Sequence, residues 1–328
     1  MPTPYICGET LDDVLREVIE EVFKHGVPIT PTKGRALELS GVLLEIVNPR
    51  ARLSRTETRG KVFSALGELT WYLAGTNKVS FVSYYIKPYM QMADGDEIYG
   101  GYGPRLFNWD GINQIDNIIH RLRQNPHSRK AVAQLFDRTD MESHKNDIPC
   151  TCTLQFLIRD RKLHLITNMR SNDVHVGLPH DVFCFTMLQE IVARSIGVEL
   201  GTYKHVVGSL HLYDRNSRAA KRFLDEGWQA TNALMPSMPE GDPWVHIRTL
   251  LELESEIREA PAPIDLRYDN LPPYWADILR LLHMYRLRRD GDGQRITEVR
   301  DSLSSTLYRP FADRLLRQLA TTGKFNLL

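Results

Sequence analysis

The stretch RSNDVHVGLPHD, residues 170–181, carries the most information about this chain. It opens with Arg170, whose planar guanidinium suits binding of an anion such as a phosphate. It closes with Asp181, a carboxyl group placed where the edge of a nucleobase could be read. The stretch therefore points to a ligand that has an anionic group at one end and a polar ring at the other.

Bulk composition excludes several classes of protein. The 328 residues are 42% hydrophobic, enough for a sizeable core, and Lys+Arg balances Asp+Glu at 41 each. With no global electrostatic field, we expect neither a nucleic-acid partner nor a membrane surface. The N-terminus has no signal pattern and no apolar run is of membrane-spanning length, which predicts a cytoplasmic protein. Four cysteines, too few for a disulfide scaffold, are expected to be reduced.

Hydrophobic periodicity predicts both helices and strands, in an order that does not alternate regularly. Thr10 is the expected N-cap of the first helix and Gly26 its end, and Gly41 is expected to interrupt a strand pair. Prolines mark linkers after Gly227, and mostly helical sequence follows them. This order predicts an α+β fold. The predicted helices are 11–25, 62–73, 182–195, 245–259, 275–289 and 308–319; the predicted strands are 37–47, 130–136, 154–158 and 163–165.

A second motif, PCTCTLQF at residues 149–156, places Cys150 directly after a proline. Taken alone, Cys150 would more often be a small buried hydrophobic residue than a nucleophile. A metal pair with Cys152 is a further alternative, but no matching Cys/His pair lies at finger-like spacing, so we expect no metal. The co-occurrence with residues 170–181 favours the nucleophile.

Together the two motifs resemble those of thymidylate synthases, P-C-H-x-x-x-Q-F and R-S-x-D-x-x-x-G-x-P-x-N, over about residues 10–225. The resemblance implies a mixed β-sheet packed with helices, with two such sheets stacked at a homodimer interface. It implies a catalytic core over residues 1–226. Residues 227–328 are then a helical C-terminal extension of the same compact domain. The last residues, 324–328, do not match the family's closing segment.

The resemblance also implies catalytic roles. Cys150 is the expected nucleophile, Glu68 organises water and proton transfer, and Tyr102 assists proton removal at C5 of the pyrimidine. Asp173 is expected to bind the pterin of the co-substrate, 5,10-methylenetetrahydrofolate, and Gly177 lets the base approach closely. From the residues alone, an acidic side chain such as Glu68 on an apolar helix would more often face solvent. A nearby cation, Arg170, is expected to help form the Cys150 thiolate.

Further residues are expected to bind the sugar and the phosphate. Arg129 and Lys130 resemble the S-R-R motif that reaches into the partner subunit's phosphate site, which gives composite sites in the homodimer. One N-terminal cation is also expected, and spacing does not choose between Lys33 and Arg35. The expected substrate-binding set is Arg170, Ser171, Arg129, Lys130, His211, Tyr213, Gly177, Lys33 and Arg35.

Two departures from the family pattern bear on the reaction. Asp181 stands where uracil-specific members have Asn, which is typical of the cytosine-specific branch. Residues 89–94, YMQMAD, lack the water-excluding tryptophans of the synthases, which favours hydration over hydride transfer. The leading hypothesis is a cytidylate 5-hydroxymethylase, with CMP favoured over dCMP on Lys130, although Ser171 points the other way. The alternatives are a dCMP hydroxymethylase, a thymidylate synthase acting on dUMP, and a non-catalytic nucleotide-binding relative.

Overall fold

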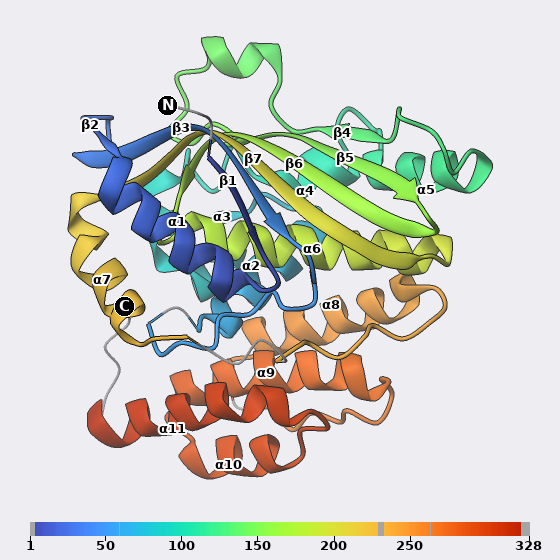
Figure 1. The fold of residues 1–328 in the computed structure, drawn as a ribbon. Helices are drawn as coiled ribbons and strands as arrows, with labels where there is room; N and C mark the ends of the chain where they lie inside the picture. Colours follow the sequence, from blue (N-terminus) through green and yellow to red (C-terminus); the bar gives the residue numbers. More distant parts are fainter. Residues whose placement is uncertain (1–3, 59, 229–232, 263, 323–328) are drawn as a thin grey trace.

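The computed structural model describes residues 4–58, 60–228, 233–262 and 264–322. Their strands form one seven-stranded sheet in the order β1-β3-β7-β6-β5-β4, with β2 paired to β3 (Figure 1). Two pairings, β1 with β3 and β6 with β7, are parallel and the others are antiparallel. The predicted α+β class with a mixed sheet is confirmed. The strands are β1 (Tyr5–Gly8), β2 (Val27–Ile29), β3 (Ala36–Ile46), β4 (Val132–Gln134), β5 (Thr151–Arg159), β6 (Lys162–Asp173) and β7 (Glu199–Tyr213).

The helices stack in layers on one side of this sheet, as Figure 1 shows. Helix α6 packs on β6 and β7, α2 packs on α6, and α9 packs on α2. None of the helices in the described ranges has both the length and the apolar composition needed to cross a bilayer. The helices are α1 (Leu11–His25), α2 (Val62–Leu73), α3 (Val79–Tyr85), η1 (Lys87–Met92), α4 (Tyr102–Phe107), α5 (Gln114–Gln124), η2 (Arg138–Glu142), α6 (Gly177–Ile196), η3 (Asp214–Asn216), α7 (Ser217–Asp225), α8 (Pro243–Glu259), α9 (Pro273–Asp290), α10 (Gly293–Asp301), η4 (Thr306–Tyr308) and α11 (Arg309–Thr322).

Several predicted elements form as expected. Thr10 caps α1 in a reciprocal capping box with Asp13, and β5 and β6 form the predicted hairpin. The helices expected in the C-terminal third appear as α8, α9 and α11. Residues 323–328, which include the unmatched closing segment, lie outside the described residues.

Several predicted boundaries are wrong; the strand predicted at 163–165, for example, is β6 and runs to Asp173. Gly41 does not divide a strand pair: β3 runs through it at a φ of 67°, since β7 pairs with Ser40 and Val42 on either side. Helix α6 begins at Gly177, five residues before the predicted start. Pro179 is tolerated there because the first turn of a helix leaves its amides unpaired in any case.

Helix α6 is buried on nearly all sides because it lies between two hydrophobic clusters. Phe183 and Met187 face the cluster formed with α2 and the C-terminal helices, whereas Phe185 and Leu188 face the cluster formed with the sheet. A helix that is apolar all round is a core helix. Polar side chains on the buried faces of α6 are therefore drawn out of water, and Asp181 is one of them.

A fully buried ion pair ties α6 to the segment before α2. Arg52 Nη2 lies 2.5 Å from Glu190 Oε2, and neither side chain is more than 1% exposed. Glu190 Oε1 also accepts a hydrogen bond from the Met238 amide at 2.9 Å, which joins α6 to the chain leading into α8. This pair is a junction between the core and the C-terminal helices.

Removing one charge of this pair should be costly. Glu190→Gln leaves the Arg52 guanidinium buried without a counter-charge, so we expect the free energy of unfolding to fall by about 3–5 kcal/mol. Urea denaturation followed by circular dichroism measures this loss. The control is Asp96→Asn, which breaks the exposed Lys78–Asp96 pair and should leave the midpoint nearly unchanged. Equal midpoints for both variants would contradict this role of Glu190.

Candidate active site

The two sequence motifs meet where β5 and β6 lie side by side. The Arg170 amide donates to the Cys150 carbonyl at 2.8 Å. The Arg170 side chain donates from Nε to the Pro149 carbonyl and from Nη2 to the Ile148 carbonyl, each at 2.9 Å. Arg170 thus fixes the loop that carries Cys150, and it uses two of its side-chain donors to do so.

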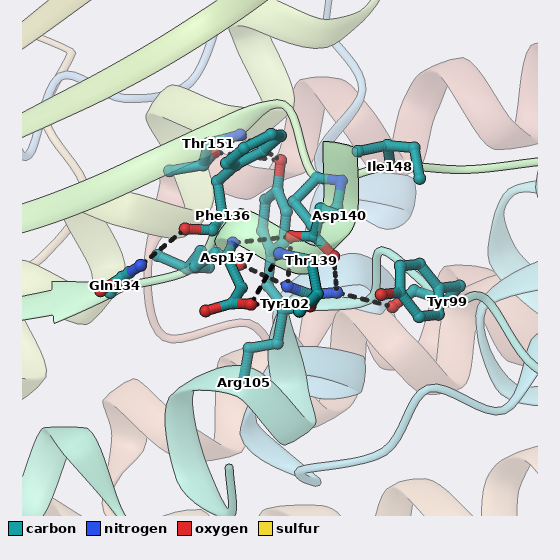
Figure 2. A network of polar contacts seen from close by, with 12 residues as sticks. Tyr99, Tyr102, Arg105, Gln134, Phe136, Asp137, Thr139, Asp140, Ile148 and Thr151 are labelled. Carbon is teal, nitrogen blue, oxygen red and sulfur yellow. Dashed lines mark hydrogen bonds and ion pairs between the residues drawn. The ribbon is translucent and has the colours of Figure 1, made fainter. Parts of the chain in front are cut away.

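Tyr102, at the start of α4, lies beside this loop. Its hydroxyl accepts hydrogen bonds from the Thr151 amide at 3.1 Å and from the Thr151 Oγ1 at 3.0 Å (Figure 2). Its ring stacks on Phe185 of α6 at 6.0 Å between centroids. Thr151 therefore positions Tyr102 next to Cys150.

A bidentate ion pair that was not expected from the sequence holds helix α4, which carries Tyr102, in place. Arg105, on the same helix α4, donates to both carboxylate oxygens of Asp140 at 2.8 Å (Figure 2). Arg105 also donates to the Leu135 carbonyl at 2.6 Å. These bonds fix α4 against η2. Sequence spacing gives no signal for this pair, because Asp140 lies in a stretch expected to be a polar loop.

Asp181 is buried in the second turn of α6, with 9% of its surface exposed. The Asn172 amide nitrogen donates to Asp181 Oδ2 at 2.5 Å. Burial raises the pKa of the Asp181 carboxyl well above its usual range; the charge of Glu68 raises it further, and the Asn172 hydrogen bond opposes the shift. A Cβ on Gly177 would lie 3.5 Å from both partners, so the glycine keeps the space next to Asp181 open.

Glu68 points into the interior, and the solvent-facing alternative is wrong. The residue is 4% exposed, and Glu68 Oε1 accepts hydrogen bonds from the hydroxyls of Tyr72 at 2.8 Å and Tyr89 at 2.6 Å. Tyr89 lies on η1, within the stretch that replaces the family's tryptophans. The electrostatic influence of Glu68 extends to Asp181, so two carboxyl groups on α2 and α6 share this region.

The charges around Cys150 oppose one another. Burial raises the pKa of the Cys150 thiol to about 11; Arg170 and Lys33 lower it, whereas Asp147 and Asp181 raise it. Arg170 thus acts on Cys150 in the expected direction, but burial outweighs it and the pKa of the thiol stays above its usual value. Asp147 was not among the predicted residues. Its carboxylate packs so closely on Gly100 that a Cβ there would lie 2.5 Å from Asp147 Oδ2.

His211 and Tyr213 lie on β7, beside the β6 strand that carries Ser171 and Asp173. In the register of the two strands, Ser171 is opposite Ser209 and Asp173 is opposite His211. Electrostatic coupling places Tyr213 near both Cys150 and Asp173. Asp173 Oδ1 accepts the amides of His175 at 2.7 Å and Val176 at 2.8 Å. Asp173 therefore orders the turn into α6.

The two N-terminal cations are placed differently. The charge of Lys33 acts on Cys150 and Asp147, whereas Arg35 lies 3.8 Å from Asp214 and its side chain is 76% exposed. Of the two, Lys33 is thus the cation whose charge acts on Cys150.

Arg129 and Lys130 are not brought together with Cys150 in this chain. Both are exposed, in the turn before β4, and the Gln155 amide donates to the Arg129 carbonyl at 3.1 Å. Gln155 lies five residues along β5 from Cys150, which corresponds to roughly 16 Å of strand. Among the residues that the structure describes, no group of three His, Cys, Asp or Glu side chains is arranged to hold a metal ion.

The opposing charges around Cys150 should determine how its alkylation rate depends on pH. In a protein with Cys7→Ser and Cys152→Ser, the iodoacetamide reaction of Cys150 should accelerate about tenfold per pH unit from pH 7 to 10, because only the thiolate reacts. Asp147→Asn removes a charge that raises the Cys150 pKa, so the rate at pH 8 should increase. Lys33→Gln removes a charge that lowers this pKa, so the rate should decrease. A rate that levels off below pH 9 in the parent protein would contradict a raised pKa.

Comparison with known proteins agrees with this geometry. A family model described as Thymidylate synthase matches residues 17–238. The deoxyuridylate hydroxymethyltransferase of Bacillus phage SP01 is 30% identical over 221 residues, which cover 63% of this chain and 58% of the phage protein. The thymidylate synthase of Bacillus mojavensis is 29% identical over 225 residues, which cover 62% of this chain and 80% of that enzyme. The chain thus spans little more than half the length of its phage relative. Since the family model covers most of the chain, the protein belongs to the thymidylate synthase family.

Proposed function

We propose that this protein is a cytidylate 5-hydroxymethylase, which transfers a one-carbon unit from methylenetetrahydrofolate to C5 of a cytosine nucleotide and then adds water. One observation carries the proposal. A carboxyl group, that of Asp181, is buried at the position where the family motif has a carboxamide, and its electrostatic influence reaches Cys150. The relatives' names support one-carbon chemistry on a pyrimidine nucleotide.

The raised pKa of Asp181 suits the cytosine edge. A protonated carboxyl donates one hydrogen bond to N3 and accepts another from the 4-amino group. When the sulfur of Cys150 bonds to C6, N3 becomes basic and takes the proton from Asp181. The resulting carboxylate then accepts from both N3–H and the amino group, an arrangement stronger than the initial one because it is charge-assisted. Arg170 and Lys33 supply the positive charge that favours the thiolate at this step.

The folate supplies the one-carbon unit, and the residues around Glu68 fit an aromatic ring system. The rings of Trp71 and Tyr89 meet edge to face at 5.4 Å, and within the described part of the chain the Trp71 indole N–H is buried without a hydrogen-bond partner. We assign pterin binding to Asp173, removal of the C5 proton to Tyr102, and orientation of the added water to Glu68. His211 and Tyr213 would hold the sugar, with Ser171 beside them.

CMP is the proposed substrate rather than dCMP. Lys130 provides a point charge where the family motif has a second arginine, and it would seat the sugar-phosphate differently. Ser171, by contrast, favours dCMP. An assay of this protein therefore compares CMP with dCMP.

A second candidate is 5-hydroxymethylation of dUMP. The name of the phage SP01 relative favours it. A protonated Asp181 also has the donor and the acceptor to pair with O4 and N3–H of uracil. The two bases differ after Cys150 adds to C6, because the Asp181 carboxylate then accepts from N3–H and the amino group of cytosine but has no donor for O4 of uracil.

We also propose a homodimer with composite sites. Side chains on the sheet face opposite α6, such as His164, Ile166 and Val206, are only partly buried, as a face that packs on a second sheet would be. Arg129 and Lys130 are exposed and would bind the phosphate in the partner's site.

Substrate specificity tests the main proposal. We incubate the protein with CMP, dCMP or dUMP and methylenetetrahydrofolate, and identify the products by mass. The expected product is 5-hydroxymethyl-CMP, without the absorbance rise near 340 nm that dihydrofolate formation causes. Asp181→Asn should shift activity toward dUMP, because a carboxamide pairs with O4 and N3–H. If the parent and Asp181→Asn proteins both process uridylates and ignore cytidylates, the proposal is wrong.

Catalysis itself is tested by Cys150→Ala, which should abolish turnover and leave nucleotide binding largely intact. Unchanged turnover would exclude Cys150 as the nucleophile. A parent protein that binds nucleotides and turns over none of them would instead favour the non-catalytic alternative.

Subunit mixing tests the composite site. Arg129→Ala and Cys150→Ala proteins, each nearly inactive, should regain partial activity when mixed under exchange conditions, because one of the two sites in a heterodimer is intact. Statistical mixing gives up to roughly a quarter of the parent activity. No recovery, despite subunit exchange demonstrated by tagged chains, would place Arg129 outside the partner's site.

A further inference from the structure

The helices α8 to α11 lie beyond the residues that match the family: α8 and α9 pack on α2, and α10 and α11 pack on α9 (Figure 1). Their contacts with the end of α3 concern the active site. Helix α3 ends at Tyr85, and η1, which carries Tyr89, begins two residues later. Whatever fixes the end of α3 therefore also fixes the start of η1.

The C-terminal helix α9 supplies donors to the last carbonyls of α3. The Tyr285 hydroxyl donates to the Tyr84 carbonyl at 3.0 Å and to the Tyr85 carbonyl at 3.4 Å. Arg289 donates to the Tyr84 carbonyl at 3.0 Å, and its guanidinium lies 4.2 Å from the centre of the Tyr84 ring. The last carbonyls of a helix have no partner within it, so these bonds complete the end of α3.

Helix α8 holds the same segment through a side chain. The Tyr85 hydroxyl donates to Glu254 Oε1 at 2.8 Å, and Glu254 is fully buried. Arg258 pairs with Glu254 at 2.9 Å and lies 4.0 Å over the ring of Phe81, also on α3. Both the backbone and the side chains of α3 are thus anchored by the C-terminal helices.

The anchored segment touches the catalytic helix next to Glu68. The ring of Tyr85 packs against Gly67 so closely that a Cβ at that position would lie 2.1 Å from the ring. Three residues into η1, Tyr89 donates its hydroxyl to Glu68 Oε1 at 2.6 Å. A continuous set of contacts therefore runs from Tyr285 through Tyr85 to both sides of Glu68.

We propose that Tyr285 is a positioning residue for the Glu68–Tyr89 pair, and that the C-terminal helices serve the water-adding end of the active site. This inference rests on the proposed hydroxymethylase function. Tyr285 contacts no substrate; it fixes the end of α3 so that Tyr89 holds Glu68 in the orientation needed to direct water. The residues beyond the family match thereby become part of the catalytic machinery.

A matched pair of variants separates positioning from general stabilisation. Tyr285→Phe removes the hydroxyl that binds α3. Tyr308→Phe removes the hydroxyl of a more deeply buried tyrosine from the same C-terminal region, but within the described residues that hydroxyl has no hydrogen-bond partner. Tyr89→Phe and the double variant Tyr89→Phe/Tyr285→Phe complete a double-mutant cycle.

Turnover is the first readout. Tyr285→Phe should lower kcat by about five- to tenfold, the effect of one lost hydrogen bond, with the nucleotide KM unchanged. The double variant should be no slower than Tyr89→Phe, because both changes act through the same pair. Multiplying effects, or an equal loss of kcat in Tyr308→Phe, would overturn the proposal.

Hydrogen exchange of the intact full-length protein is the second readout and needs no activity. Amides of residues 79–92 should exchange faster in Tyr285→Phe and at the parent rate in Tyr308→Phe. Unchanged exchange in Tyr285→Phe would overturn the positioning role whatever the activity. A parent protein that turns over no nucleotide would instead refute the proposed function, with the exchange result deciding the structural coupling alone.

Discussion

The site depends on keeping two carboxyl groups out of water. Asp181 and Glu68 lie on helices that face each other, and burying a carboxyl group is costly unless it is hydrogen-bonded or neutral. Asn172 donates a hydrogen bond to Asp181, and the hydroxyls of Tyr72 and Tyr89 donate hydrogen bonds to Glu68. The burial follows from the position of α6 between the two hydrophobic clusters. The same packing that stabilises the fold thus sets the protonation of the group that would meet the base.

The surroundings of Cys150 also combine burial with nearby carboxyl groups. Arg170 and Tyr102 hold the loop, yet burial and two carboxyl groups raise the pKa of the Cys150 thiol more than two cations lower it. The thiol is thus fixed in place without a lowered pKa. A thiol of this kind resists oxidation, since reactivity follows the thiolate.

Sequence reasoning predicted much of the fold because its signals are local. Periodicity and caps identified α1, the β5–β6 hairpin and the C-terminal helices, and two motifs brought Cys150 and Arg170 together. Long-range effects were not predictable in the same way. The resemblance implied a catalytic Glu68, but the residues alone did not show that it is buried, since its partner Tyr89 lies on another element. Asp147 was not predicted, although its carboxylate lies close to Gly100, far along the chain. The different surroundings of Lys33 and Arg35 also required the tertiary structure.

The C-terminal helices illustrate the same limit. Their ranges were predictable, yet the contact of Tyr285 with the end of α3 joins residues some two hundred positions apart. No pattern of residue spacing predicts a contact between positions so far apart in the sequence. Asp181, Tyr89 and the helices that support them are connected only in the folded protein.

The central claim, that Asp181 reads a cytosine edge, is tested most directly by turnover, because the two bases differ most once sulfur has bonded to C6. Steady-state kinetics of the parent protein with CMP, dCMP and dUMP compares kcat/KM for the three nucleotides on one site. The account predicts that kcat/KM for CMP and dCMP is about tenfold or more above that for dUMP, a difference of about 1.4 kcal/mol in activation free energy. A kcat/KM for dUMP equal to that for CMP would contradict it.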